Sequence, residues 1–137
     1  MRPVMALVWL AGCGGGQVTS QVIGETGRLD DLEPPIIDHT PVTTAQPFGA
    51  DVLIEAIVTD TSGVISVSVH YRQETSVEWK TKAMAEVGGD LYQGWISGDD
   101  VGSGGMRYYL EATDYEQNTG CMPEDCEVDP WDFAVTP

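Results

Sequence analysis

DVLIEAIVTDTSGVISVSVHYR, residues 51–72, is the stretch that decides the fold. Apolar residues occupy every second position in both halves, and this period of two is typical of strands with one buried face. Between the halves, Asp60, Ser62 and Gly63 favour a turn, because short polar side chains bond their own backbone and glycine tolerates positive φ. The stretch therefore predicts two consecutive strands at the centre of an antiparallel β domain. The alternating apolar residues are Val52, Ile54, Ala56, Val58, Ile65, Val67, Val69 and Tyr71.

Five more short strands are expected around this pair. Each is a short apolar segment, and turn signals recur about every ten residues. Residues 77–87 are ambiguous, since residues 83–86 also suit one turn of helix. With no amphipathic helix elsewhere, we expect an all-β fold, a single antiparallel β-sandwich of about seven strands. The five additional strands are 36–37, 77–87, 91–96, 106–113 and 131–135, and the first is placed at a sheet edge because Pro41 interrupts its ladder.

The charge balance limits the classes of partner. The 137 residues include 22 acidic and 6 basic side chains, for a formal net charge of −16. Such a field repels nucleic acid and anionic lipid headgroups, and it favours cations and basic proteins. The length suits one domain with additional terminal segments.

The amino-terminal segment predicts export and lipid attachment. Arg2 precedes an apolar run, residues 4–10, that is shorter than the roughly 20 residues needed to span a bilayer and fits a secretory leader. Leu10-Ala11-Gly12-Cys13 resembles the lipobox of bacterial lipoproteins. The resemblance implies that residues 1–12 are removed as a signal peptide and that Cys13 is lipidated. It also implies attachment to the cell envelope, at the outer membrane because Gly14 replaces an acidic retention residue.

A flexible linker is expected between the lipidated cysteine and the folded part. Residues 13–33 are rich in Gly, Ser, Thr and Gln and show no sustained period. Pro34 and Pro35 then open the domain, residues 34–137. The competing interpretation of the amino-terminal segment is a buried first strand with a free core cysteine, which the glycines after Cys13 disfavour.

A second resemblance concerns the strand over residues 106–113. Residues 108–114 read YYLEATD, followed by Asn118 and Gly120. They are similar to the Tyr-x-apolar-x-Ala-x-(Asn/Asp) strand of fibronectin type III and bacterial immunoglobulin-like surface domains, and residues 58–64 and 71–72 match the preceding strands. The resemblance implies a fold that hosts many functions, with Tyr108 as the tyrosine-corner residue bonded to nearby backbone. Tyr108, Leu110 and Ala112 are expected to face the core.

The segment from Cys121 to Asp129 is longer and more acidic than the last hairpin of such domains. Cys121 and Cys126 fit either a disulfide or half of a metal site. Export and the wide separation of the two histidines favour the disulfide, which would stiffen the loop. Four carboxylates of this segment are predicted to bind a basic protein partner, because complementary charge speeds association and selects partners. They belong to Glu124, Asp125, Glu127 and Asp129.

Calcium and carbohydrate are alternative ligands. Four oxygen-bearing residues lie on loops beside strand ends, and the last three alternate like the start of a calcium loop but lack its central Gly and closing Glu. They are Asp60, Asp114, Glu116 and Asn118, and capping of turns by the two aspartates is the competing interpretation. Trp95 and Trp131 are candidates for stacking against a sugar, although most large aromatics of a sandwich pack in its core.

Catalysis is not expected. The sequence contains no nucleophile elbow, phosphate loop or zinc-binding helix motif. The prediction is therefore a non-catalytic, lipid-anchored envelope protein that presents an acidic, disulfide-stiffened loop to a protein partner, with calcium as the one cofactor considered. The alternatives are a carbohydrate-binding accessory module, a calcium-binding surface domain, and a spacer without a ligand.

Overall fold

The computed structural model describes residues 30–137. The chain divides into two units, Met1–Leu32 and Glu33–Pro137, and every strand of the described part lies in the second. The predicted leader and Cys13 lie outside the described residues and stay predictions. Residues 30–137 contain no helix with the length and apolar composition that crossing a membrane requires.

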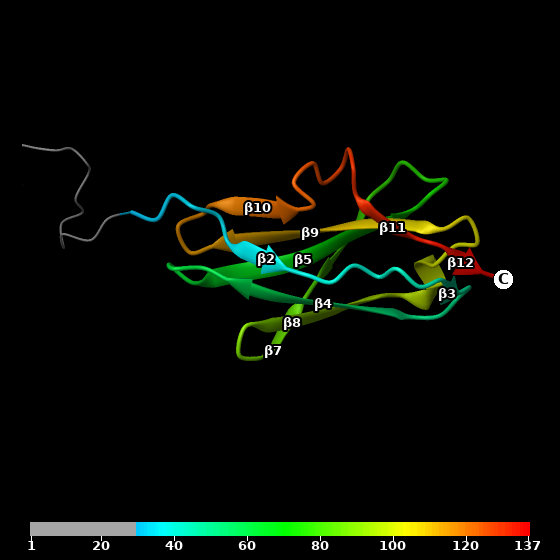
Figure 1. The fold of residues 1–137 in the computed structure, drawn as a ribbon, viewed down its shortest axis with the longest axis horizontal. Helices are drawn as coiled ribbons and strands as arrows, with labels where there is room; N and C mark the ends of the chain where they lie inside the picture. The colour runs from blue at the N-terminus through cyan, green and yellow to red at the C-terminus, as the bar shows by residue number, and fades with distance from the viewer. Residues whose placement is uncertain (1–29) are drawn as a thin grey trace, which may run out of the picture. The chain divides into compact units, whose positions relative to one another are not determined.

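The domain is an all-β sandwich (Figure 1). One sheet is antiparallel with the order β2-β4-β8-β7, and the other has the order β10-β9-β5-β6, with β11 also pairing with β9. Two short strands, β3 and β12, form a separate parallel pair. The bounds are β2 Ile36–Asp38, β3 Gln46–Pro47, β4 Val52–Thr59, β5 Val64–Gln73, β6 Lys80–Ala83, β7 Ala85–Gly88, β8 Leu91–Ile96, β9 Met106–Asp114, β10 Thr119–Met122, β11 Trp131–Phe133 and β12 Val135–Thr136, with a 3-10 turn at Gly98–Asp100.

The two strands predicted over residues 51–72 are β4 and β5, and they belong to different sheets. In β4 all four expected apolar residues are buried. In β5 the alternation begins only at Val67, and Ile65 is 48% exposed. The register between β5 and β9 shifts between Val64 and Ser66. Because a bulge inserts one extra residue, it reverses the side-chain phase and places Ile65 outside.

The segment predicted over residues 77–87 contains two strands, β6 and β7, so the helical alternative for residues 83–86 is wrong. β6 pairs with β5 in one sheet and β7 pairs with β8 in the other, and the chain crosses between sheets at Met84. Met84 is 6% exposed, and its amide donates to the carbonyl oxygen of Val67 at 2.8 Å. Gly94 makes room for it, since a Cβ there would lie 2.7 Å from the Met84 side chain.

The core lies between the two sheets and includes the predicted inward residues of β9. Tyr108, Leu110 and Ala112 are each at most 1% exposed. The described part has eleven strands against about seven expected. Two predicted strands each divide in two, and the short strands β3 and β10 were missed because two to four residues are too few to carry a periodic signal.

Candidate functional site

The acidic insert, residues 123–130, interrupts an edge strand. β10 pairs with β9 from Thr113 to Leu110, and β11 resumes along the same strand from Tyr108 to Met106. Only Tyr109 of β9 lies between the two paired segments. The chain therefore leaves the sheet after Met122, forms the insert, and returns to the same edge two positions further along β9.

The predicted disulfide is confirmed. Cys121, on β10, is bonded to Cys126 within the insert, with a Cα–Cα distance of 6.1 Å. The carbonyl oxygen of Asp125 also accepts the amides of Val128 and Asp129, each at 2.8 Å. These bonds fix the turn at its start and at its tip, so the insert is presented in one conformation at low entropic cost to binding.

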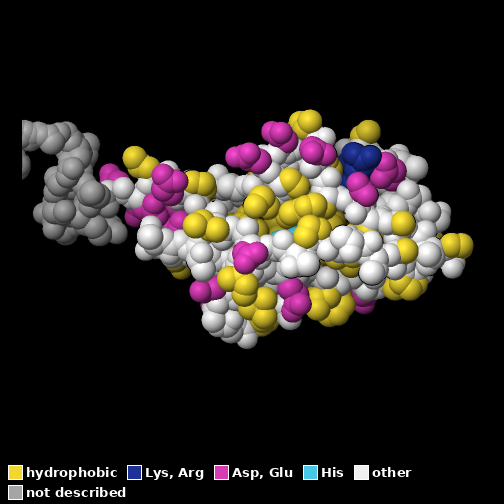
Figure 2. Space-filling model, viewed as in Figure 1, with side chains coloured by type: hydrophobic (Ala, Val, Ile, Leu, Met, Phe, Trp, Pro, Cys, Tyr) yellow, Lys and Arg dark blue, Asp and Glu magenta, His cyan; other side chains and the backbone are white. Residues whose placement is uncertain are grey.

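The four predicted carboxylate residues of the insert are all exposed, and half of its eight residues are acidic. Figure 2 shows acidic side chains grouped on this rim of the domain. The insert also exposes one apolar side chain, Val128, which is 85% accessible. The site thus combines clustered negative charge with an apolar contact at the tip.

One carboxylate ties the insert to the sheet beneath it. The Tyr109 hydroxyl donates to Glu127 at 3.3 Å. Burial, and then the charge of Glu127, raise the pKa of Tyr109 to about 12. The Tyr109 ring stacks on His70 with centroids 4.5 Å apart and meets the edge of Trp79 at 4.9 Å. This aromatic support was missed in the sequence because its members come from three separate segments.

The predicted calcium residues take part in local turns. The carboxylate of Asp114 is fully buried and accepts the amides of Glu116 and Asn118 and the side-chain amide of Asn118, each at 2.8 Å. Asp60 accepts the amide and hydroxyl of Ser62. One carboxylate oxygen of Asp60 lies within 4.8 Å of one of Asp114. The structure brings the two aspartates together, in the turn-capping role of the competing interpretation, and calcium stays a prediction.

The two predicted tryptophans lie on different sheets. Trp95, on β8, is 50% exposed and is paired across the strands with Leu53. Trp131, on β11, is half-buried against His39, with centroids 4.7 Å apart, and against Tyr108 at 5.4 Å. They do not form one platform, and only Trp95 presents a large exposed face.

A hydrogen-bonded network fills the space beside Trp131. The His39 Nδ1–H donates to the carbonyl oxygen of Glu55 at 2.6 Å, and its Nε2 accepts from the Tyr108 hydroxyl at 2.8 Å. That hydroxyl accepts the amide of Val42 at 2.9 Å. Tyr108 therefore bonds backbone 66 residues upstream, in place of the nearby backbone expected of a tyrosine corner. Burial lowers the pKa of His39 below its ordinary value of 6.5.

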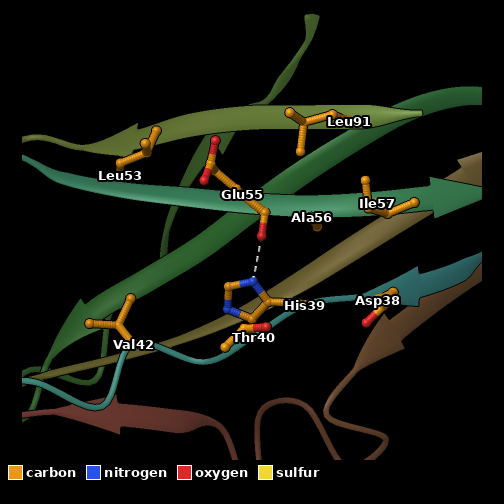
Figure 3. Close-up of a pocket in the computed structure, with 9 residues that line it drawn as sticks. All are labelled: Asp38, His39, Thr40, Val42, Leu53, Glu55, Ala56, Ile57 and Leu91. Atoms are coloured by element: carbon orange, nitrogen blue, oxygen red, sulfur yellow. Dashed lines mark hydrogen bonds between the residues drawn. The ribbon is translucent and has the colours of Figure 1, made fainter. Parts of the chain in front are cut away.

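A shallow pocket of about 290 Å³ lies next to this network, over β4 and the segment after β2 (Figure 3). His39 and Glu55 line it, and Figure 3 shows the Glu55 carboxylate turned away from the imidazole. The imidazole meets the main-chain oxygen of Glu55 and not its carboxylate. The two side chains line the same pocket, and the imidazole is held by the main chain of β4.

Comparisons with known proteins support the fold alone. No family model and no curated protein matches the chain. Among solved structures, the endo-β-1,4-mannanase from Thermotoga petrophila contains a similar region, with a TM-score of 0.52 and 15% sequence identity. The similarity covers 78% of this chain and 21% of the mannanase chain, so this chain matches about a fifth of that enzyme.

Proposed function

We propose that the protein is a non-catalytic interaction domain of the cell envelope that binds a basic protein partner through the acidic insert. The observation that carries the proposal is the placement of the insert. Its exposed carboxylates stand on a segment held by a disulfide and by two flanking strands on one edge of β9. A displayed group that is already ordered loses little entropy on binding.

The rest of the domain compensates this charge only in part, since Arg107 is the one cationic residue of residues 30–137 with a recorded electrostatic interaction with the insert, at Asp129. The four cationic side chains of residues 30–137 lie outside the insert, and two of them form ion pairs, Lys80 with Asp100 and Arg107 with Glu74. Arg72 donates to main-chain oxygens of residues 73–76. Most of the insert charge therefore remains to attract complementary positive charge on a partner, which raises association rates most at low ionic strength.

Export, lipidation at Cys13 and a location at the outer membrane are parts of the same proposal. They rest on the lipobox resemblance of residues 10–13. The fibronectin type III or immunoglobulin-like character of the domain also belongs to the proposal, and the two-sheet architecture supports it.

Site-specific photo-cross-linking in cells of the source organism tests the proposal. A photoreactive residue replaces Val128 at the tip of the insert, and the matched control replaces Val87, which is 51% exposed on β7. We expect one dominant cross-linked protein from position 128, absent from position 87. It should disappear when the four insert acids are changed to their amides. Identical products from both positions would contradict the proposal.

Carbohydrate binding is the second candidate, and the exposure of Trp95 favours it. Gln93 lies on the same face of β8, and its side-chain amide donates to the carboxylate of Glu55 on β4. An exposed aromatic ring beside such polar groups is suited to stacking and hydrogen bonding with a sugar. The structural similarity to an endo-β-1,4-mannanase suggests β-1,4-mannan as a probe. Mannan should shift the fluorescence of the wild type and of Trp131→Phe but not of Trp95→Phe; the absence of any shift would remove this candidate.

A further inference from the structure

The free edges of two strands border an apolar groove next to the acidic insert. β2 is the terminal strand of one sheet, β10 is a terminal strand of the other, and they run side by side (Figure 1). The groove has a volume of about 650 Å³. Residues 34–37 line one wall, residues 119–122 line the other, and Glu124 of the insert completes the lining.

The groove exposes apolar side chains on both walls. Ile36 is 71% exposed and Met122 is 40% exposed. Pro34 packs so closely on Gly120 that a Cβ at position 120 would lie 2.9 Å from the Pro34 Cβ. Exposed apolar surface beside polar residues often marks an interaction site.

The main chain of β10 has an unpaired side. The amide of Asp114 donates to the carbonyl oxygen of Asn118, so alternate residues of β10, Gly120 and Met122, face β9 with their main-chain groups. The main-chain groups of Thr119 and Cys121 then point away from β9, where no strand of the described part pairs with them. β10 therefore offers donors and acceptors to an added strand.

The opposite wall is less suited to strand pairing. Pro34 and Pro35, which lead into β2, have no amide hydrogen. This wall supplies apolar contact, whereas β10 supplies main-chain hydrogen bonds. An occupant that uses both is an extended segment lying along β10 with one row of side chains in the groove.

The carboxylates beside the groove indicate which side chains the bound segment carries. The insert follows β10 directly, Glu124 lines the groove, and Glu111 is paired with Cys121 on the outer face of the sheet. A second copy of this chain would bring another 16 net negative charges. A segment that alternates apolar and basic residues instead places its apolar row against Ile36 and Met122 and its basic row near the carboxylates.

We propose that this groove binds an extended segment of the partner protein in which apolar residues alternate with Lys or Arg, added as a strand to β10. The proposal rests on the proposed function of the acidic insert and assigns the shape and sequence pattern of what the insert recognises.

Two synthetic peptides of about eight residues test the proposal on the full chain. One alternates Lys with Val, and the other carries Ser in place of each Val, so charge and length are matched. Titration followed by fluorescence anisotropy gives affinities, and backbone NMR shifts locate the contact. The Lys-Val peptide should bind at least about tenfold more tightly, as the burial of one apolar side chain requires. The largest shifts should fall on residues 119–122.

Variants separate the groove from the insert. Ile36→Ser and Met122→Ser change exposed side chains and should remove most of the difference between the two peptides. Val87→Ser, on the exposed side of β7, is the matched control and should preserve it. Glu124→Gln with Asp125→Asn should weaken both peptides together. Equal affinity for the two peptides, or shifts away from residues 119–122, would overturn the groove proposal alone. Insensitivity of both peptides to the acid variants would instead overturn the function proposed for the insert.

Discussion

The acidic residue that ends β9 and the four acidic residues of the insert are used in opposite ways. Asp114 ends the strand, is fully buried, and accepts three hydrogen bonds from its own turn. The four acids of the insert are exposed, and among them only Glu127 has a side-chain hydrogen bond, which comes from Tyr109. A high content of acidic residues therefore does not by itself indicate function. The Asp114 carboxylate stabilises the fold, whereas the four carboxylates of the insert are exposed to solvent.

The strongest test of this division is the loss of a carboxylate from each group. Asp114→Ala leaves three donors without an acceptor, and we expect it to lower the free energy of unfolding by about 3 kcal/mol. Asp125→Ala, the matched change in the insert, should cost less than about 0.5 kcal/mol because its side chain is exposed. Urea unfolding measures both, and equal losses would break the comparison.

Tyr108 and Tyr109 are adjacent on β9 and point to opposite faces of the sheet, so their hydroxyl groups allow the same comparison between the core and the insert. Tyr108→Phe removes the hydroxyl that bonds His39 and Val42, leaves two partly buried groups unpaired, and should cost about 2.5 kcal/mol. Tyr109→Phe removes only the contact with Glu127 and should cost less than about 1 kcal/mol. The two values come from chemical denaturation at neutral pH. A larger loss for Tyr109→Phe would mean that the insert helps to hold the fold.

Removal of the disulfide tests whether the insert contributes to the stability of the domain. Replacement of both Cys121 and Cys126 by Ser opens a ring of six residues, which in the chain-entropy model costs about 2 kcal/mol. We also expect faster proteolysis within residues 123–130, with the remainder of the domain protected. Mass spectrometry of limited digests measures this, and cleavage first elsewhere would contradict it.

The pH dependence of stability separates the buried network from the exposed acids. Burial lowers the pKa of His39 in the folded protein, so the unfolded chain takes up a proton first as the pH falls below about 6.5. The contribution of neutral His39 to the free energy of unfolding is fully present above that pH. It is lost as the pH falls towards the pKa of His39 in the folded protein. The decline in urea midpoint between pH 7 and pH 5 should be larger for the wild type than for His39→Gln. Parallel profiles would exclude His39 as the cause.

The smallest expected change is the removal of charge from the insert. Neutralising Glu124, Asp125, Glu127 and Asp129 together as amides should leave the melting temperature unchanged or slightly raised, since like charges no longer repel. Differential scanning calorimetry at low and high salt measures the effect. A clear decrease in melting temperature would place these acids with Asp114 among the residues that stabilise the fold.

Local alternation was enough to predict the all-β class and the core residues of β4 and β9. It was misleading at Ile65, because a bulge is set by pairing with β9 and not by the local pattern. The network of His39, Tyr108 and Val42 joins residues more than 60 positions apart and has no local signal. The acidic composition of the insert was evident in the sequence. Its position within a divided edge strand was not, because β10 has only four residues, too few for a periodic pattern.

The divided edge strand also indicates where the sequence is free to change. The two ends of the insert pair with Leu110 and Tyr108, which have only one residue between them on β9. Since the ends are already held together by the sheet, doubling the length of the insert adds only about 0.6 kcal/mol of closure entropy. The edge formed by β10 and β11 can therefore carry inserts of different length and composition. New binding loops can be introduced at this position in engineered versions of the domain.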